Sequence, residues 1–322
     1  MTGACPILVV TPNPAVDVTY HVAEEVAWDG VNRVQSVTRR AGGKGLNVAS
    51  VLLQLGAAAE LAGFLGGPQG EALRRLVDIR LDGDWVDIEG ETRCTTAVVD
   101  TRSTTLFNEP GPAVGDADWE CLTRDVAARA TQGGVVVLSG SCPPGTKPEH
   151  VKALIDAAHA AGASVLADTS GPLLLEAAAA GADLLKPNRE ELLEATGADT
   201  VTAGATALLE RGASAIAVSS GEKGLFLFIR TDDGISSWSA APAEVVHGNP
   251  TGAGDAAVAA LALGLNRIAA GADPSVAWPR TLAEAVAASA AAVLIPVAGS
   301  IDTVARERFL PNIHVKEFHV AH

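Results

Sequence analysis

Short, mainly apolar runs alternate with longer stretches of helical character along most of the chain. The apolar runs occupy residues 5–10, 59–64, 135–140, 164–170, 183–187 and 215–220, and most of them end in Gly, Ser or Pro. The helical stretches between them cover 46–56, 119–129, 150–162, 189–197 and 202–212. Buried strands that alternate with helices predict an α/β fold, in which a central and mainly parallel sheet carries helices on both faces. Ligands of such sheets bind where loops leave the carboxyl ends of the strands.

Two segments, 17–40 and 92–109, lack this rhythm. Both are polar and alternating, rich in Thr and Val, and contain no helical stretch. Strands of this kind have one face to spare, so we expect them to pair as a small sheet. That sheet would project over the pocket as a lid and offer a surface for a homodimer. No low-complexity linker or repeat divides the chain, which predicts one principal domain over residues 1–322.

The composition and charge narrow the range of partners. Hydrophobic residues make up 48% of the 322 residues and charged residues 19%, so a sizeable core is expected. The formal net charge of −15 argues against nucleic acid and against an anionic membrane surface as partners. An anionic substrate would then need a local patch of cations. Arg33, Arg39, Arg40 and Lys44 provide one, without an intervening acid.

The cysteines and the first residues bear on the compartment. Cys5, Cys94, Cys121 and Cys142 are widely spaced and form no CxxC pair. We therefore expect neither a disulfide framework nor a zinc site, and a cytoplasmic location. The first ten residues contain neither a basic region nor a long apolar span, so no signal peptide or membrane helix is expected.

The strongest local motif is Asn-Pro-Thr-Gly-Ala-Gly-Asp at 249–255, followed by an apolar helical run. Gly252 and Gly254 let backbone N–H groups converge at the positive end of a helix, which favours a phosphate or a developing negative charge. Asp255 in the first turn can accept a proton from an attacking hydroxyl. One alternative is an ordinary helix start with a capping Asp. Another is a dinucleotide fingerprint, GxGxxA, but that motif normally opens the first βαβ unit and here it lies late in the chain.

A second glycine-rich motif, Ala-Gly-Gly-Lys-Gly-Leu-Asn at 41–47, opens a helical stretch. Its glycines allow a ligand to touch the main chain, while Lys44 adds a positive charge and Asn47 an amide for hydroxyl groups. The motif is not a Walker A loop, because GxxxxGK[ST] is absent. A plain tight turn remains the alternative.

Three further loops follow predicted strands. The first loop is Lys-Pro-Asn-Arg-Glu-Glu at 186–191, in which Lys186 could contact a nucleotide phosphate. Asn188 and Glu191 could hold Mg²⁺ through waters. They could also form a capping box at the start of a helix, and this role is compatible with binding the ion. Residues 219–224 contain two glycines that suit a nucleotide lying over the turn, although a hairpin would look the same. Residues 139–145 offer hydroxyls, Ser139 among them, to a substrate. Cys142 lacks an accompanying His and is not expected to be a nucleophile.

Taken in order, these motifs resemble the PfkB/ribokinase family of carbohydrate kinases over nearly the whole chain. TPNPAVDVTY, GVNRVQ, AGGKGLNVASVL, GFLGG, GETR, SGSCPPG, KPNREEL, VSSGEKG and NPTGAGD all look like the branch of tagatose-6-phosphate kinases and 1-phosphofructokinases. The resemblance implies a ribokinase-like three-layer α/β/α fold with a small β lid. One departure is Pro250, where most of the family has Ser or Thr. Asn-Pro at this place resembles the tagatose-6-phosphate kinases and favours tagatose 6-phosphate over fructose 1-phosphate.

The resemblance also implies roles for individual residues. Asp255 would be the base, and the backbone of Gly252, Ala253 and Gly254 the anion hole. Sugar hydroxyls would be held by Asp17, Gly43 and Asn47, and the substrate phosphate by Arg33, Lys44 and Arg93. ATP with Mg²⁺ would be bound by Lys186, Asn188, Glu191, Ser219, Gly221 and Gly224.

The favoured function is transfer of a phosphoryl group from MgATP to a hydroxyl of a phosphorylated ketohexose, with the lid excluding water. One alternative keeps the kinase and changes the acceptor to fructose 6-phosphate, a free sugar, a nucleoside or a cyclitol. The cations Arg33, Lys44 and Arg93 argue against an uncharged acceptor. A non-catalytic sensor of sugar phosphates is a further alternative, and the presence of Asp255 and Lys186 argues against it.

Overall fold

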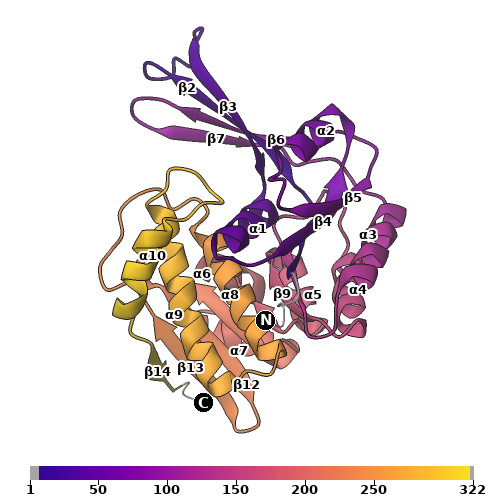
Figure 1. Cartoon of the computed structure of the whole chain (residues 1–322), viewed down its shortest axis with the longest axis vertical. Helices are drawn as coiled ribbons and strands as arrows, with labels where there is room; N and C mark the ends of the chain where they lie inside the picture. Colours follow the sequence, from indigo (N-terminus) through magenta and orange to yellow (C-terminus); the bar gives the residue numbers. More distant parts are fainter. Residues whose placement is uncertain (1–6, 320–322) are drawn as a thin grey trace.

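The structure, a computed structural model, describes residues 7–319. Its body is one ten-stranded sheet in the order β14-β13-β12-β11-β10-β9-β8-β1-β4-β5 (Figure 1). The strands are β1 Ile7–Thr11, β4 Ala59–Leu65, β5 Asp82–Asp87, β8 Val135–Ser139, β9 Ser164–Asp168, β10 Leu184–Leu185, β11 Ala215–Ser219, β12 Leu225–Thr231, β13 Gly234–Ala240 and β14 Lys316–Phe318. The strands from β5 to β11 run parallel, whereas β12, β13 and β14 extend the sheet in antiparallel pairs.

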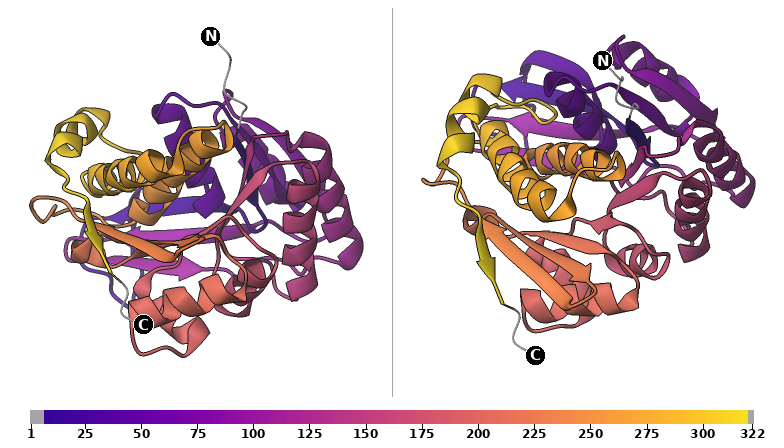
Figure 2. Two further views of the ribbon diagram at one scale, coloured as in Figure 1. Left: turned by 90° about the horizontal axis from the view of Figure 1, so that it is seen from below. Right: turned by 60° about the horizontal axis from the view of Figure 1, so that its bottom comes forward.

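Helices cover both faces of this sheet. They are α1 Lys44–Gln54, α2 Gly67–Leu76, α3 Asp116–Arg129, α4 Pro148–Ala160, α5 Gly171–Ala179, α6 Arg189–Thr196, α7 Val201–Arg211, α8 Ala253–Ala269, α9 Pro274–Val293 and α10 Thr303–Phe309. Figure 2 shows α8 and α9 on one side of the sheet and the helices between residues 148 and 211 on the other. The predicted three-layer fold is confirmed.

Strand β1 shows why an apolar run requires this arrangement. Ile7 and Val9 pack into a cluster with buried residues of α1, α8 and α9, while Leu8 and Val10 pack into a second cluster with α3, α4 and α5. Because side chains alternate across a strand, a run without polar residues needs cover on both faces.

The two polar segments form a separate sheet of four strands, in the order β3-β2-β6-β7. These strands are β2 Ala15–Val22, β3 Val34–Gly42, β6 Arg93–Val99 and β7 Thr104–Asn108. The parallel pair β2–β6 joins the two segments, and Ala15 lies opposite both Gly42 and Arg93. The sheet projects from the body at the top of Figure 1.

Several elements were not predicted from the sequence, among them α2, α5, α9 and β5. Helix α9 contains Pro279, a residue that normally ends or kinks a helix, so the sequence around it does not predict one continuous helix. Cys94, Cys121 and Cys142 are free thiols, and Cys5 lies outside the described residues. None of the helices within residues 7–319 is both long and apolar enough to cross a membrane.

Candidate active site

All of the predicted site residues except Arg33 lie around one edge of the body, where five neighbouring parallel strands end. Strands β11, β10, β9, β8 and β1 lie side by side, and the loop after each contributes to the site. The chain moves outward from β1 to β4 and returns to β8 on the other side of β1, so this edge holds the topological switch point. Helices α1 and α8 begin above the same edge (Figure 1).

Helix α8 presents unused amides to this edge. Gly252, its N-cap, has φ 87°, and a Cβ there would fall 2.8 Å from the Cα of Ala298, so glycine is required. The N–H of Ala253 donates to the carbonyl of Pro250 at 3.1 Å. Among the described residues, the amides of Gly252, Gly254 and Asp255 at this helix start make no hydrogen bond, so of the three amides predicted to form the anion hole only that of Ala253 is engaged within the chain.

The carboxylate of Asp255 is held in place at the same helix start. Its side chain is buried, and Oδ2 accepts a hydrogen bond of 2.8 Å from Nδ2 of Asn47 on α1. Burial, followed by the negative charge of Asp168, raises the pKa of Asp255 to about 6, although Asn47, Lys44 and Lys186 act in the opposite direction. A carboxyl group with this pKa is mostly ionised at pH 7, yet it binds a proton more strongly than an exposed Asp.

Two lysines flank a residue that the sequence motifs did not indicate. Asp168 ends β9, is fully buried, and lies 3.3 Å from Nζ of Lys186 and 3.5 Å from Nζ of Lys44. Lys186 is itself buried, and its ammonium lies beside Gly254, where a Cβ would be 3.8 Å from Nζ. Asp168 is the main cause of the raised pKa of Lys44. The two cations and the free amides of α8 therefore converge.

Ser139 does not offer its hydroxyl to the surface of the site. It is fully buried, and its Oγ donates to Asp168 at 3.4 Å. The exposed hydroxyl of this loop is that of Ser141, which lies 3.4 Å from Nδ2 of Asn13. Ser141 and Asn13 were not among the predicted site residues.

Asn188 and Glu191 form a capping box at the start of α6. The amide of Glu191 donates to Oδ1 of Asn188 at 2.8 Å, and the amide of Asn188 donates to Oε2 of Glu191 at 2.9 Å. Glu191 is close enough to Lys44 to contribute to its raised pKa, and its Oε1 makes no hydrogen bond within the described residues. The structure therefore leaves one carboxylate oxygen of Glu191 for a ligand.

A cavity of about 450 Å³ lies between the loop after β11 and helices α8 and α9. Ser219, Gly221 and Gly224 line it, as do Ala253 and Gly254 at the start of α8. Its apolar wall comes from residues that sequence reasoning missed: Pro242, Val245, Val246, Val286 and Val293. Valines of this kind have no local signature, because they look like ordinary core residues of a helix or loop.

The near end of the second sheet completes the site. Gly43, the N-cap of α1, has φ 103°. The carboxylate of Asp17 occupies the place that a side chain of Gly42 would fill. Burial outweighs the attraction of Arg93 and Arg40 and raises the pKa of Asp17. Nε of Arg93 donates to the carbonyl of Asn13 at 3.0 Å, so its guanidinium faces the junction between the two sheets.

Arg33 is the predicted site residue that the structure does not bring to the others. It precedes β3, whose first residue pairs with Val22, whereas Gly42 at the other end of β3 pairs with Ala15. Eight residues of extended chain separate these ends, or about 27 Å. Arg33 therefore lies at the far tip of the projecting sheet.

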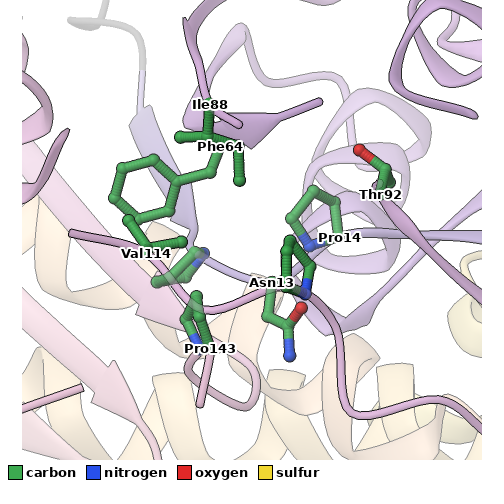
Figure 3. Close-up of a pocket in the computed structure, with 9 residues that line it drawn as sticks. Asn13, Pro14, Phe64, Ile88, Thr92, Val114 and Pro143 are labelled. Atoms are coloured by element: carbon green, nitrogen blue, oxygen red, sulfur yellow. The ribbon is translucent and has the colours of Figure 1, made fainter. Parts of the chain in front are cut away.

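Figure 3 shows a small cavity at the junction of the two sheets. Asn13 and Pro14 lie on one side of a small cavity of about 10 Å³, and Phe64 and Val114 lie on the other. Thr92 is buried beside them, and its Oγ1 accepts a hydrogen bond of 2.9 Å from the amide of Gly66. The connections β1–β2, β5–β6 and β7–α3 all pass this point.

Comparison with known proteins gives a consistent result. Residues 11–304 match the model of the pfkB family carbohydrate kinases. The 1-phosphofructokinases of Xanthomonas campestris and Haloferax volcanii are both 37% identical to the chain, over 80% and 78% of this chain and 83% and 81% of their own lengths. A structure of phosphofructokinase-2 from Escherichia coli superimposes with a TM-score of 0.86 at 27% identity, covering 96% of this chain and 99% of that one. Ribokinase from Arabidopsis thaliana, at 23% identity and a TM-score of 0.69, covers 95% and 99% and shares the fold.

Proposed function

The chain belongs to the pfkB family of carbohydrate kinases, and from that premise we propose that it phosphorylates a primary hydroxyl of a phosphorylated ketohexose with MgATP. The observation that carries the proposal is Asp255. Its buried carboxylate lies at a helix start with free amides, next to two lysines and a cavity large enough for much of a nucleotide.

The residues divide the work as follows. Asp255 accepts the proton of the acceptor hydroxyl as its oxygen attacks phosphorus, and Asn47 keeps the carboxylate in orientation. The amides of Gly252 and Gly254 and the ammonium of Lys186 stabilise the charge on the transferring group. Little reorganisation is needed when the phosphates bind, because burial already holds Asp255 and Lys186 in place and the capping box of α6 already holds Asn188 and Glu191.

The donor set at Glu191 and Asn188 suits magnesium. Among the described residues no three His, Cys, Asp or Glu side chains gather as a metal site, whereas Mg²⁺ keeps several waters and needs one or two carboxylates plus phosphate oxygens. Glu191 would hold the ion, directly or through water, with Asn188 fixing its carboxylate. When bound, the ion neutralises charge on the nucleotide phosphates.

For the acceptor, we propose fructose 1-phosphate first, because the curated relatives at 37% identity are 1-phosphofructokinases. Tagatose 6-phosphate, which Pro250 favoured in the sequence, is the second candidate. The test is ADP release with fructose 1-phosphate, tagatose 6-phosphate, fructose 6-phosphate and the free sugars. A kcat/KM highest for fructose 1-phosphate supports the proposal. ADP release with none of them would contradict it and favour a sensor of sugar phosphates.

We assign the acceptor's phosphate to Arg93 and Lys44. The assignment is supported by the position of Arg93 beside Asn13 at the junction with the lid, and by Lys44, which lies two residues after β3 and is 45% exposed beside Asp168. We expect Arg93→Ala to raise KM for a phosphorylated acceptor at least tenfold and to change kcat less, because the charge contributes to binding before and during transfer. The matched control is Arg102→Ala. That residue pairs with Glu25 at 2.9 Å in the lid, and we expect no change in KM. An unaltered KM in Arg93→Ala would indicate an unphosphorylated acceptor.

We further propose that the second sheet acts as a lid over the acceptor and as the contact of a homodimer, in a cytoplasmic enzyme. Its support is the apolar surface of that sheet and its loops. Exposed apolar side chains there are Trp28, Val31, Val34, Val37, Leu106 and Phe107, with exposed fractions from 42% to 90%.

A further inference from the structure

Asp168 is the most deeply buried charge of the site, and the mechanism above does not use it. We propose that Asp168 is a positioning residue, which aims Lys44 and Lys186 at the start of α8 and keeps Asp255 a strong enough base for proton transfer. The proposal rests on the proposed kinase function.

The first argument is geometric. Asp168 pairs with Ser139 in the β8–β9 register, and its carboxylate lies within 3.5 Å of the polar atoms of Ser139, Lys44 and Lys186. These groups come from β8, α1 and the loop after β10. Gly140, whose φ of 113° favours glycine, lies next to Lys44, since a Cβ built there would be in ordinary contact with the Cβ of the lysine at 3.6 Å. A single carboxylate therefore fixes two cations that are 142 residues apart in the chain.

The second argument concerns charge. Burial tends to raise the pKa of Asp168, but Lys186 and then Lys44 outweigh it, so the net pKa is lowered and the group is ionised. One negative charge between two positive ones leaves an excess cation for a phosphate. Both N–O distances exceed the 2.7–2.9 Å of a tight charge-assisted hydrogen bond, so either ammonium can turn to a phosphate oxygen and stay near its counter-ion.

The third argument concerns Asp255. The groups that face it are Asn47 and Lys44 from α1, Lys186 from the loop after β10, and Asp168 from β9. Both lysines favour the ionised carboxylate of Asp255, whereas the charge of Asp168 opposes them. Without Asp168 the two lysines would act unopposed, and Asp255 would lose proton affinity.

The test is the pH profile of kcat/KM in Asp168→Asn. We expect KM for the phosphorylated acceptor to rise at least tenfold and the acid limb of the profile to move to lower pH, by roughly half a pH unit or more. The second pKa of the acceptor's phosphate is also near 6, but it affects wild type and variant equally, so the difference between profiles is the readout. Asp168→Glu, which keeps the charge and displaces it, should restore the wild-type acid limb with a raised KM.

Asp183→Asn is the matched control. Oδ2 of Asp183 accepts the amide of Val165 at 2.7 Å, at the opposite end of β9, and contacts His159. We expect this variant to lose thermal stability and to keep both KM and the acid limb. An acid limb that stays in place in Asp168→Asn would overturn the proposal. A raised Mg²⁺ requirement with an unmoved acid limb would overturn it as well, since it would point to a metal ligand.

Two further variants test the proposal if Asp168→Asn alone does not fold. Lys186→Met removes one charge, and Lys186→Met with Asp168→Asn restores the balance of buried charges. The double variant should show a KM for the acceptor at least tenfold above that of Lys186→Met, because Lys44 has lost its anchor. Equal KM values would count against Asp168. These outcomes require an active wild type, so they are distinct from the failure of the kinase function itself.

Discussion

At the scale of single residues, the burial of the Asp255 carboxylate lowers the stability of the folded protein at neutral pH and makes the carboxylate a stronger base. Its folded pKa of about 6 lies above the unfolded value of 3.8. Protonation of this group therefore stabilises the folded state. Its contribution to the free energy of unfolding is fully present below pH 3.8 and is lost as the pH rises through 6, and the loss amounts to at most about 3 kcal/mol.

We expect Asp255→Asn to lower kcat at least a hundredfold, since general-base assistance is worth about 10²–10⁴ in rate. Nucleotide binding, measured by calorimetry, should survive. The same variant should melt at a higher temperature than wild type at pH 8, and the difference should vanish below pH 4. Asp233→Asn, in the exposed turn between β12 and β13, serves as control and should change neither quantity. Near-normal turnover in Asp255→Asn would remove this residue as the base.

The sequence located the residues that sit in glycine-rich motifs, because local chemistry marks them. Asp255, Lys44 and Asn47 are of this kind, and the structure brings them together. Asp168 is the last residue of the otherwise ordinary apolar strand β9, and its partners reach it from three other elements. Its importance depends on the register of β8, β9 and β10, which no local pattern contains.

At the scale of elements, the junction of the body and the lid depends on Asn13. Its Nδ2 donates to the carbonyl of Pro110 at 3.0 Å and lies 3.4 Å from Oγ of Ser141, so one amide ties the exit from β7 to the loop after β8. We expect Asn13→Ala to raise KM for the acceptor several-fold and to increase ATP hydrolysis without transfer, because a loosened lid admits water. The assay compares ADP formed with sugar bisphosphate formed.

Asn32 provides the control for this variant. Its side chain also makes two hydrogen bonds, both of 2.9 Å and both to Ala27, but at the far tip of the lid. Asn32→Ala should leave the ratio of ADP to bisphosphate at the wild-type value. If Asn13→Ala also kept the wild-type ratio of ADP to bisphosphate, contacts other than those of Asn13 would hold the lid closed.

The sequence predicted that two polar segments pair, yet it did not predict how. The parallel contact of β2 with β6 joins two segments of the chain that are more than 70 residues apart in sequence. The alternation of polar and apolar residues along each strand is compatible with several partner strands. The same limit placed Arg33 with the phosphate-binding residues, because proximity in sequence to Lys44 does not reveal a nine-residue strand between them.

At the scale of the whole molecule, the exposed apolar side chains of the lid and its loops predict an assembly. We expect the wild-type protein to sediment as a dimer and Phe107→Glu to shift it toward the monomer, because a buried charge without a partner is costly. Phe107 is 49% exposed in the single chain. Ile79→Glu, at a 99% exposed position on the body, is the control and should not alter the mass. A monomeric wild type would contradict the proposal.

The construction of the lid from two separate insertions, one after β1 and one after β5, restricts how its specificity can evolve or be engineered. Neither half makes a complete sheet, since β2 bonds to β3 on one side and to β6 on the other. If only one insertion were taken from a relative, its strand at the β2–β6 contact would face a strand with which it does not match. Exchange of acceptor preference between such enzymes therefore calls for two coordinated transplants that keep Ala15 in register with Arg93.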